Sequence, residues 1–495
     1  RRPPRSTPKP SSAASDVYKR QIKNAETYEP LNVVRVCESL TCELFGAHKL
    51  LNELKESENK NIKVVPGPCM GRCDVAPTVC VGKNYVDQAS AKSVREAIKN
   101  NDFDAVIPNY IDLDQYRKNG GYQIAEQVRE GMIDNDQIIK TLKESGLKGK
   151  GGAGFPTGMK WEIVSKYEGK KYVAVNGDEG EPGTFKDRSY LEKDPHRFLE
   201  GALIASLFIN ASNVYIYMRD EYPAVIKILK DEILKLENEN IIPAGHFIIR
   251  RGAGAYICGE ESAMIESIEG KRGLPRHRPP YVAEVGLFNS PTLTNNLETL
   301  FWIRDIIEKG SEWFAEKGVS GNKGFHSFSV SGRVREPGVK VAPAGVTIQE
   351  LIDDYCGGMK EDHIFKGYLP GGASGGILPA SMNNIPLDYG SKELTEAGCF
   401  LGSAAIVVLS DKDSMKDVAL NLLKFFEEES CGQCTPCRVG TEKTVKLMKE
   451  KIWNKEKLAD LSEVMSQASI CGLGQAATNP LNSVLKYFGN EISYE

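Results

Sequence analysis

The distribution of cysteines constrains the fold of this 495-residue chain more than any other feature. Eight of its twelve cysteines fall into two clusters near opposite ends of the chain, and the other four stand alone. A disulfide framework is typical of small secreted domains, whereas this chain is long and does not open with the apolar stretch of a secretory signal. The clustering therefore indicates protein-bound metal centres in a reducing compartment.

The carboxy-terminal cluster has the spacing C-x2-C-x2-C, followed by a fourth cysteine in a separate segment. Its members are Cys431, Cys434, Cys437 and Cys471. Three thiolates at two-residue gaps can surround one side of a cubic cluster, which favours a [4Fe–4S] centre over a zinc site built from two C-x2-C pairs. A structural zinc ion remains the alternative from spacing alone.

Helical patterns flank this cluster. Ser414 is expected to cap the first helix. The apolar side of that helix would consist of Met415, Val418, Ala419, Leu422 and Phe426. The apolar sides of two further helices would consist of Val445, Met448 and Ile452, and of Leu461, Val464, Met465 and Ala468. The cluster is therefore expected to lie in a small helical bundle.

The amino-terminal cluster consists of two cysteine pairs, C-x4-C and C-x3-C. Its members are Cys37, Cys42, Cys69 and Cys73. Residues 32–36 and 62–65 predict buried strands, residues 43–54 predict a helix between them, and a hairpin is expected across Gly82. The cysteines should then lie on two loops that follow strands. Four thiolates suit a [2Fe–2S] centre with two ligands per iron, and a zinc site is again the alternative.

A glycine-rich loop at residues 149–154 matches the pattern G-x-G-x-x-G of dinucleotide-binding folds. That interpretation requires a strand before the loop and a helix after it. Here residues 137–145 predict a helix, and Pro156 and Gly158 are expected to break any helix that follows. The standard dinucleotide context is therefore absent, although the bare backbone of such a loop can still bind a phosphate or contact a flat ring.

An acidic segment follows the strand expected at residues 172–175. Its carboxylates are those of Asp178, Glu179, Glu181 and Asp187. Four carboxylates within this short segment are costly to place together unless a ligand supplies donors, such as ribose or ribityl hydroxyl groups or a carboxamide. A solvated acidic turn is the alternative. A further glycine-rich stretch at residues 252–262 adds two more carboxylates beside exposed backbone.

Composition and charge argue against several classes of function. Hydrophobic residues make up 41% and charged residues 26% of the chain, which is an ordinary globular balance. A net charge of −4 gives no basis for binding nucleic acid or an anionic membrane surface. No apolar run approaches the roughly 18 residues that span a bilayer. Residues 1–20 are basic, rich in proline and serine, and resemble a translated cloning adaptor, so we interpret them as a non-native leader.

Taken together, these segments resemble the NADH-binding flavoprotein subunit of complex I. They are similar as well to the diaphorase subunits of NAD-reducing hydrogenases and NAD-dependent formate dehydrogenases. The matching segments lie in the family's order between about residues 108 and 485 and include SGLKGKGGAGFPTGMKW, VNGDEGEPGTFKDR and ESCGQCTPCRVG. The amino-terminal unit separately resembles the thioredoxin-like [2Fe–2S] protein that usually neighbours that subunit.

The resemblance implies an α/β multidomain protein of four domains. A thioredoxin-like [2Fe–2S] domain would occupy residues 21–105. A Rossmann-like domain without the standard dinucleotide fingerprint would bind FMN and NADH at residues 106–325. A ubiquitin-like β-grasp domain would occupy residues 326–411, and a helical [4Fe–4S] domain residues 412–495.

The resemblance also implies FMN rather than FAD, with NAD(H) as the substrate. The residues implied to hold FMN are Gly149, Gly151, Gly152, Lys160, Asn176, Asp178, Tyr256, Gly259, Glu260, Asn295 and Asn296. Those implied to line the nicotinamide pocket are Glu179, Glu181 and Glu261, of which Glu179 and Glu181 would position the nicotinamide. Phe155 and Phe288 would stack on adenine. Lys150 stands where the family commonly has arginine, which keeps the charge but loses the planar fork.

A flavin can hold two, one or no electrons, so it can join a hydride donor to one-electron clusters. We therefore expect hydride transfer from NADH to FMN and single-electron exit through the [4Fe–4S] cluster, with the [2Fe–2S] centre as a reservoir or branch. The fused [2Fe–2S] unit and the lack of an appended ferredoxin tail favour a cytoplasmic module that works with a molybdenum formate dehydrogenase chain. The alternatives are a complex I subunit at the inner face of the membrane, a hydrogenase diaphorase subunit, or a zinc scaffold without activity.

Overall fold

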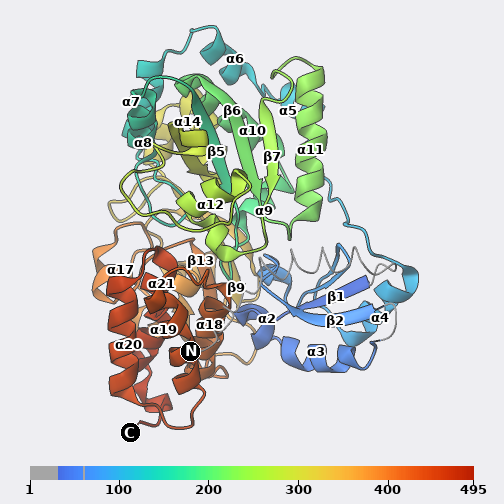
Figure 1. Cartoon of the computed structure of the whole chain (residues 1–495), viewed down its shortest axis with the longest axis vertical. Coiled ribbons are helices and arrows are strands. Elements are labelled where there is room, and N and C mark those ends of the chain that lie inside the picture. Colours follow the sequence, from blue (N-terminus) through green and yellow to red (C-terminus); the bar gives the residue numbers. More distant parts are fainter. Residues whose placement is uncertain (1–31, 59–61, 495) are drawn as a thin grey trace, which may run out of the picture.

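The computed structural model describes residues 32–58 and 62–494, so the leader assigned to residues 1–20 lies outside the described part of the chain. Within these residues the chain forms three β-sheets and a helical bundle, as expected for an α/β multidomain protein. The amino-terminal sheet (blue) and the bundle (red) lie beneath the central parallel sheet (green) in Figure 1. None of the helices described combines the length and the apolar character needed to cross a bilayer.

The amino-terminal unit is a four-stranded mixed sheet with helices packed against it. The strands are β1 (Asn32–Cys37), β2 (Ile62–Gly67), β3 (Val79–Val81) and β4 (Asn84–Val86), in the order β2-β1-β3-β4. The helices are α2 (Leu40–Leu44), α3 (Ala47–Lys55) and α4 (Ala91–Asn100). The expected hairpin across Gly82 is confirmed. The single helix expected over residues 43–54 is wrong, because Gly46 adopts a left-handed φ of +86° and separates α2 from α3.

The central unit is built on a parallel sheet with the strand order β7-β6-β5-β8. The strands are β5 (Lys171–Gly177), β6 (Ala211–Met218), β7 (Phe247–Arg251) and β8 (Thr292–Asn296). The helices before and between the strands are α5 (Leu113–Lys118), α6 (Gln123–Arg129), α7 (Asn135–Ser145), α8 (Thr157–Ser165), α9 (Lys186–Leu191), α10 (Pro195–Ile209), α11 (Pro223–Asn238) and α12 (Glu261–Ile268). After β8 come α13 (Leu297–Phe301), α14 (Ile303–Lys309) and α15 (Ser311–Ala315). Parallel neighbours require such crossover connections, so the helices cover the sheet.

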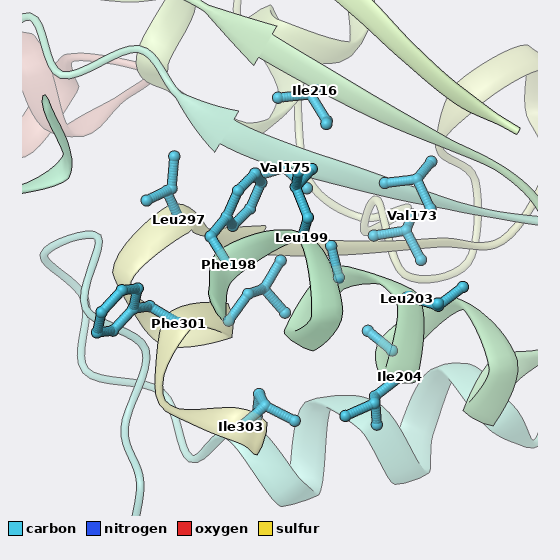
Figure 2. Packing of buried hydrophobic residues seen from close by; sticks show 14 of the residues in the cluster. Val173, Val175, Phe198, Leu199, Leu203, Ile204, Ile216, Leu297, Phe301 and Ile303 are labelled. Atoms are coloured by element: carbon cyan, nitrogen blue, oxygen red, sulfur yellow. The ribbon is translucent and has the colours of Figure 1, made fainter. Parts of the chain in front are cut away.

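Helix α10 is buried on almost every side because it lies between the sheet and an outer layer of helices. Figure 2 shows Phe198 and Leu199 of this helix beneath Val175 of β5, in one continuous apolar cluster. Each such side chain contributes about 1.5–3 kcal/mol relative to leaving it exposed. This packing fixes the carboxyl end of β5, where the acidic segment begins.

The third sheet has the order β10-β9-β13-β11-β12, with β9 and β13 parallel at its centre and the other neighbours antiparallel. Its strands are β9 (Phe325–Gly332), β10 (Gly338–Pro343), β11 (Phe365–Leu369), β12 (Leu378–Pro379) and β13 (Ala405–Ser410). Helix α16 (Ile348–Glu350) continues as a wider turn over Leu351–Tyr355, and α17 (Lys392–Glu396) follows β12. Thr347 and Glu350 form a capping box at the start of α16, which fixes where this helix begins.

The carboxy-terminal bundle confirms the helices expected around the second cysteine cluster. It contains α18 (Met415–Glu429), α19 (Thr435–Met448), α20 (Lys455–Ala468), α21 (Gly472–Ala476) and α22 (Asn479–Tyr487). Ser414 caps α18 by accepting from the N–H of Asp417 at 3.3 Å. Three apolar assignments are wrong: Ile452 lies beyond the end of α19, and Val464 and Ala468 of α20 are exposed. Met465 is buried as expected, and Leu458 and Ser462 complete the inward side of α20.

Candidate functional site

The glycine-rich loop joins α7 to α8 and is closed on itself. The N–H of Gly149 donates to the carbonyl oxygen of Phe155 at 2.8 Å. The expectation that no helix follows the loop is wrong, since α8 begins at Thr157 with Pro156 as its N-cap residue. The first N–H groups of a helix have no partner within it, so a proline is tolerated there. A helix rather than a strand precedes the loop, and the standard dinucleotide context is therefore absent, as the sequence indicates.

The loop lies across the carboxyl end of β8 and beneath the third sheet. A Cβ atom added at Gly151 would lie 3.1 Å from Cβ of Asn296, and one added at Gly152 would lie 3.7 Å from the backbone of Gly402. Gly152 also has a φ of +118°, which side-chain-bearing residues rarely adopt. A side chain at Gly151 would crowd Asn296, so the loop backbone is bare where it meets the end of β8. A pocket beside the loop is lined by Gly152, Ala153, Asp388, Tyr389, Gly390, Ser391, Leu394, Thr395, Phe400, Leu401 and Gly402.

Asp178 follows β5 and holds a buried carboxyl group. Its Oδ2 atom is buried without a hydrogen-bond partner, and burial raises the pKa of this carboxyl to about 8. Its backbone N–H donates to Oδ1 of Asn176 at 3.1 Å, and Nδ2 of Asn176 donates to the carbonyl oxygen of Gly259 at 2.7 Å. A buried polar atom without a partner costs about 1–3 kcal/mol. The site is therefore suited to a ligand hydroxyl group that donates to Asp178.

Glu179 and Glu181 are both buried, and protein groups already occupy their oxygens. Glu179 accepts from the N–H of Asp187 at 2.9 Å, from the N–H of Arg188 at 3.2 Å and from the Tyr222 hydroxyl at 3.0 Å. Burial raises its pKa to about 7. Its side chain thus points to the start of α9. The assignment of Glu179 to the nicotinamide stays a prediction.

Glu181 lies beneath a loop of the third sheet. It accepts from the N–H of Ser374 at 2.9 Å and from the hydroxyl of the same residue at 2.5 Å. A Cβ atom added at Gly372 would lie 2.8 Å from Cδ of Glu181, so the loop can pack against this carboxyl group only with glycine at position 372. Sequence reasoning missed this contact of Ser374, which is 193 residues away from Glu181 along the chain.

Lys160 and Glu261 face each other at the same edge of the central sheet. Their Nζ–Oε1 distance is 3.1 Å, and Lys160 also donates to the carbonyl oxygen of Thr294 at 3.1 Å. Glu260 caps α12 by accepting from the N–H groups of Ser262 and Ala263, both at 3.0 Å. The structure therefore brings the predicted residues of the loop, the acidic segment and α12 to the carboxyl ends of parallel strands, where ligands bind in open α/β sheets.

Other predicted residues point into the protein or lie elsewhere. Asn295 accepts from the indole N–H of Trp161 at 3.0 Å, and Asn296 donates to Asp187 at 2.7 Å. Phe155 and Phe288 are 44% and 46% exposed. The ring of Phe288 packs 5.5 Å from that of Tyr172, near the start of β5 and away from the acidic segment. The roles assigned to these residues stay predictions.

The Lys150 side chain turns away from the glycine loop and into the interface with the third sheet. Its Nζ atom donates to the carbonyl oxygen of Phe325 at 2.5 Å and lies 2.9 Å from Nδ1 of His326. Nε2 of His326 lies 2.6 Å from Oδ1 of Asp388. Burial lowers the pKa of Lys150 to about 8 and that of His326 to about 4. Sequence reasoning missed His326 and Asp388 because neither belongs to a motif.

We expect Lys150→Ala to destabilise the protein by about 2–4 kcal/mol, because it leaves two buried acceptors without a donor. Thermal unfolding followed by circular dichroism measures the loss. Lys140→Ala is the matched control, since Lys140 is exposed on α7 and its truncation should change stability by less than about 0.5 kcal/mol. Equal stability of the two variants would contradict this role for Lys150.

The four carboxy-terminal cysteines surround one hollow between the bundle and the central unit. Cys431, Cys434, Cys437 and Cys471 all line it, together with the apolar side chains of Ile257, Pro275 and Leu473. Among the described residues, no three His, Cys, Asp or Glu side chains are arranged to hold a single metal ion. Thiols around an apolar hollow fit a multi-iron cluster better than one zinc ion.

The four amino-terminal cysteines are buried together where the first unit meets the central unit. The sulfur atoms of Cys69 and Cys73 are 3.5 Å apart, and the Cys37 thiol contacts those of Cys42 and Cys69. The prediction that all four lie on loops is wrong for three of them, because Cys37 ends β1, Cys42 lies within α2 and Cys73 begins a single 3-10 turn at Cys73–Val75. Four converging thiols without a nearby disulfide fit a [2Fe–2S] centre.

One short segment joins the acidic site to the carboxy-terminal hollow. A Cβ atom added at Gly259 would lie 3.1 Å from the carbonyl oxygen of Asp178, whereas Ile257 lines the hollow. Tyr256 donates its backbone N–H to Glu429 of α18 at 2.8 Å, and its ring packs 5.1 Å from that of Phe425. Residues 256–259 thus contact both sites.

Three family models match separate parts of the chain. They are the thioredoxin-like [2Fe–2S] ferredoxin at residues 25–102, the Nuo51 FMN-binding domain at residues 142–305 and the NADH-ubiquinone oxidoreductase-F iron–sulfur binding region at residues 417–495. These matches agree with an FMN-binding domain between a [2Fe–2S] domain and a [4Fe–4S] domain.

The chain is similar in sequence to subunits of NADH-quinone oxidoreductase and in structure to a hydrogenase chain. The F 2 subunit of the NADH-quinone oxidoreductase of Rhizobium meliloti is 40% identical over 401 residues, which cover 78% of this chain and 94% of that protein. The corresponding F-type protein of Aquifex aeolicus is 40% identical over 399 residues, covering 78% and 91%. A chain of the crystal structure of NAD+-reducing [NiFe]-hydrogenase in the H2-reduced state superposes with a TM-score of 0.82 at 28% identity, covering 97% of this chain and 89% of that one.

Proposed function

This chain belongs to the family of NADH-oxidising FMN and iron–sulfur subunits that includes the F-type subunits of NADH-quinone oxidoreductase, and on that premise we propose how its residues serve the reaction. It is a flavin and iron–sulfur oxidoreductase with FMN-, [4Fe–4S]- and [2Fe–2S]-binding domains, as expected from the sequence. The observation that carries the proposal is the contact of residues 256–259 with both the acidic site and the cysteine hollow.

The flavin would be held at the carboxyl ends of β5 and β8. In this proposal the backbone of the glycine loop and the Lys160 ammonium face the phosphate, and the unpaired Asp178 oxygen accepts from a ribityl hydroxyl group. Gly149, Gly151, Gly152, Asn176, Gly259, Glu260, Asn295 and Asn296 complete the proposed set. When bound, FMN supplies the conversion between a two-electron hydride and single electrons.

Glu181 and Glu261 would border the nicotinamide, with Phe155 offering an exposed ring for adenine. The loop at residues 371–376 covers Glu181 and excludes water from this side of the site. No side chain needs to act as an acid or base for hydride transfer itself, so these residues orient the reactants. Cys431, Cys434, Cys437 and Cys471 would ligate the cluster that takes electrons outward, and Ile257 lines the same hollow.

We further propose four domains, at residues 21–105, 106–325, 326–411 and 412–495. The three separate sheets and the bundle support this division. The third sheet has its first and last strands parallel at the centre and a helix after the first hairpin, which supports a ubiquitin-like β-grasp domain. The parallel central sheet with its crossover helices supports a Rossmann-like FMN domain.

The parent assembly we propose is a multisubunit complex of the complex I or NAD-reducing hydrogenase type. The relatives named above favour this alternative over the formate dehydrogenase-type module. The superposition on the hydrogenase chain covers 97% of this chain, so the structural similarity extends over the fused amino-terminal unit. Purification of the native complex, followed by mass spectrometry of its subunits, decides between membrane subunits, a hydrogenase subunit and a molybdopterin formate dehydrogenase.

Anaerobic addition of NADH to the purified chain should bleach its flavin absorbance at about 450 nm, because the flavin accepts the hydride. Clusters reduced by the same addition should then appear in low-temperature electron paramagnetic resonance spectra. Subtracting the spectrum taken before addition provides the control. A colourless protein that contains zinc and does not respond to NADH would support the scaffold alternative and refute this proposal.

A further inference from the structure

Two buried arginines of the central unit reach the loop that carries Cys69 and Cys73. Arg219 donates to the carbonyl oxygen of Cys69 at 2.5 Å, and Nε of Arg188 donates to the carbonyl oxygen of Gly71 at 2.8 Å. Both side chains are buried. The backbone of the cysteine loop is therefore held by charged donors from another part of the chain.

The two arginines differ in how far their charge is neutralised. Arg188 is paired with Asp74 at 3.0 Å and with Glu192 at 2.6 Å. Arg219 is paired with Glu221 at 3.2 Å, and its two terminal nitrogens donate to the carbonyl oxygens of Glu179 and Cys69. Carbonyl groups carry no net charge, so more of the positive charge of Arg219 acts on its surroundings.

A backbone donor from the same unit faces the cysteine sulfurs. The N–H of Gly183 lies within hydrogen-bonding reach of the thiols of Cys69 and Cys73, and the ring of Phe185 packs against both. Gly183 has a φ of +91°, and a Cβ atom there would lie 3.1 Å from Val407. The acidic segment thus touches the amino-terminal centre as well as the proposed flavin site.

We propose that Arg219 raises the reduction potential of the [2Fe–2S] centre across the boundary between the amino-terminal and central units. Reduction adds one electron, delivered from NADH through the flavin, and so adds one negative charge to the centre. A buried positive charge nearby stabilises that reduced form, and hydrogen bonds to the sulfurs act in the same direction. The inference rests on the proposed function, in which Cys37, Cys42, Cys69 and Cys73 are the ligands.

The test is a redox titration of the full chain, followed through the electron paramagnetic resonance signal of the reduced [2Fe–2S] centre. Arg219→Gln should lower the midpoint potential by the equivalent of about a tenfold change in the one-electron equilibrium, or about 59 mV. Glu221→Gln keeps Arg219 and removes its counter-charge, so it should shift the midpoint in the opposite direction.

Two controls separate charge from structure. Arg219→Lys retains the charge without the planar fork and should keep a midpoint close to that of the wild type. Arg251→Gln removes an exposed arginine that pairs with Asp220, so solvent screening should leave the midpoint unchanged.

Unchanged midpoints in Arg219→Gln and Glu221→Gln, with intact spectra, would overturn the inference. If Arg219→Gln loses the electron paramagnetic resonance signal, Glu221→Gln tests the inference alone: a higher midpoint potential supports it, and an unchanged one overturns it. A wild-type chain without any [2Fe–2S] signal would refute the ligand assignment instead, so the two failures are distinguishable.

Discussion

Cys434→Ser is expected to leave the reduction of ferricyanide by NADH near the wild-type rate while abolishing electron transfer to the partner subunits. The proposed flavin site lies at the strand ends of the central sheet, and a small soluble oxidant would take electrons there. Cys434 lines the hollow that faces the bundle. The rate of electron transfer to the partner subunits should fall by more than about 100-fold. Mutation of a residue that only hydrogen-bonds to a metal ligand already costs up to about 100-fold in activity, and Cys434 is a proposed ligand itself.

Both rates can be measured on the purified parent complex, with the [4Fe–4S] signal monitored by electron paramagnetic resonance. Cys399→Ser is the matched control, because Cys399 is buried outside both clusters and its sulfur lies 3.9 Å from the Ser483 hydroxyl. That variant should retain both activities. Undiminished transfer to the partner subunits in Cys434→Ser would refute the role of this cluster as the exit.

Asp178→Asn should weaken FMN binding and at the same time stabilise the flavin-free protein. The pKa of Asp178 is raised to about 8 by burial, from an ordinary value of 3.8. The folded protein therefore holds a proton that the unfolded chain has lost, and its stability falls as pH rises from about 4 to 8. Asparagine does not titrate, so the gain should be small near pH 4 and on the order of 3–5 kcal/mol at pH 8.

Flavin fluorescence titration above pH 8, where Asp178 is ionised, measures binding, which should weaken about 10- to 100-fold because the amide of the variant offers no charged acceptor. Thermal unfolding of the flavin-free protein at pH 5 and pH 8 measures stability. Asp231→Asn is the control, because Asp231 is exposed on α11 beside Lys227. A pH-independent difference between Asp178→Asn and the wild type would contradict the titration of this carboxyl group.

Local pattern was enough to predict the cofactor centres but not the contacts that support them. Cys431, Cys434 and Cys437 are spaced as the geometry of a cluster requires. Their role can therefore be predicted from the sequence before the fold is known. Ser374 and His326 contact Glu181 and Lys150 from sites far along the chain. Nothing in their local sequence indicates those contacts, because they arise only when the third sheet packs on the central one.

Errors in the predicted elements have the same physical origin. Gly46 divides an otherwise continuous apolar pattern, since its left-handed backbone turns the chain before α3. Val464 fits a helical period but faces solvent, because packing against α19 and α21 selects a neighbouring stripe of α20. The adenine-stacking role that the resemblance implies for Phe288 stays a prediction, and the ring of this residue packs against Tyr172.

The amino-terminal unit contacts all three other parts of the molecule. Asn421 of the bundle donates to the carbonyl oxygen of Glu38, the Thr41 hydroxyl lies 3.0 Å from that of Ser331 in the third sheet, and Arg219 donates to Cys69. Covalent connection makes this docking intramolecular, at an effective concentration in the millimolar range for a short linker. Contacts too weak to bind a separate protein at its cellular concentration can therefore persist in this chain. The charges at the interface can then be selected for electron transfer rather than for binding affinity.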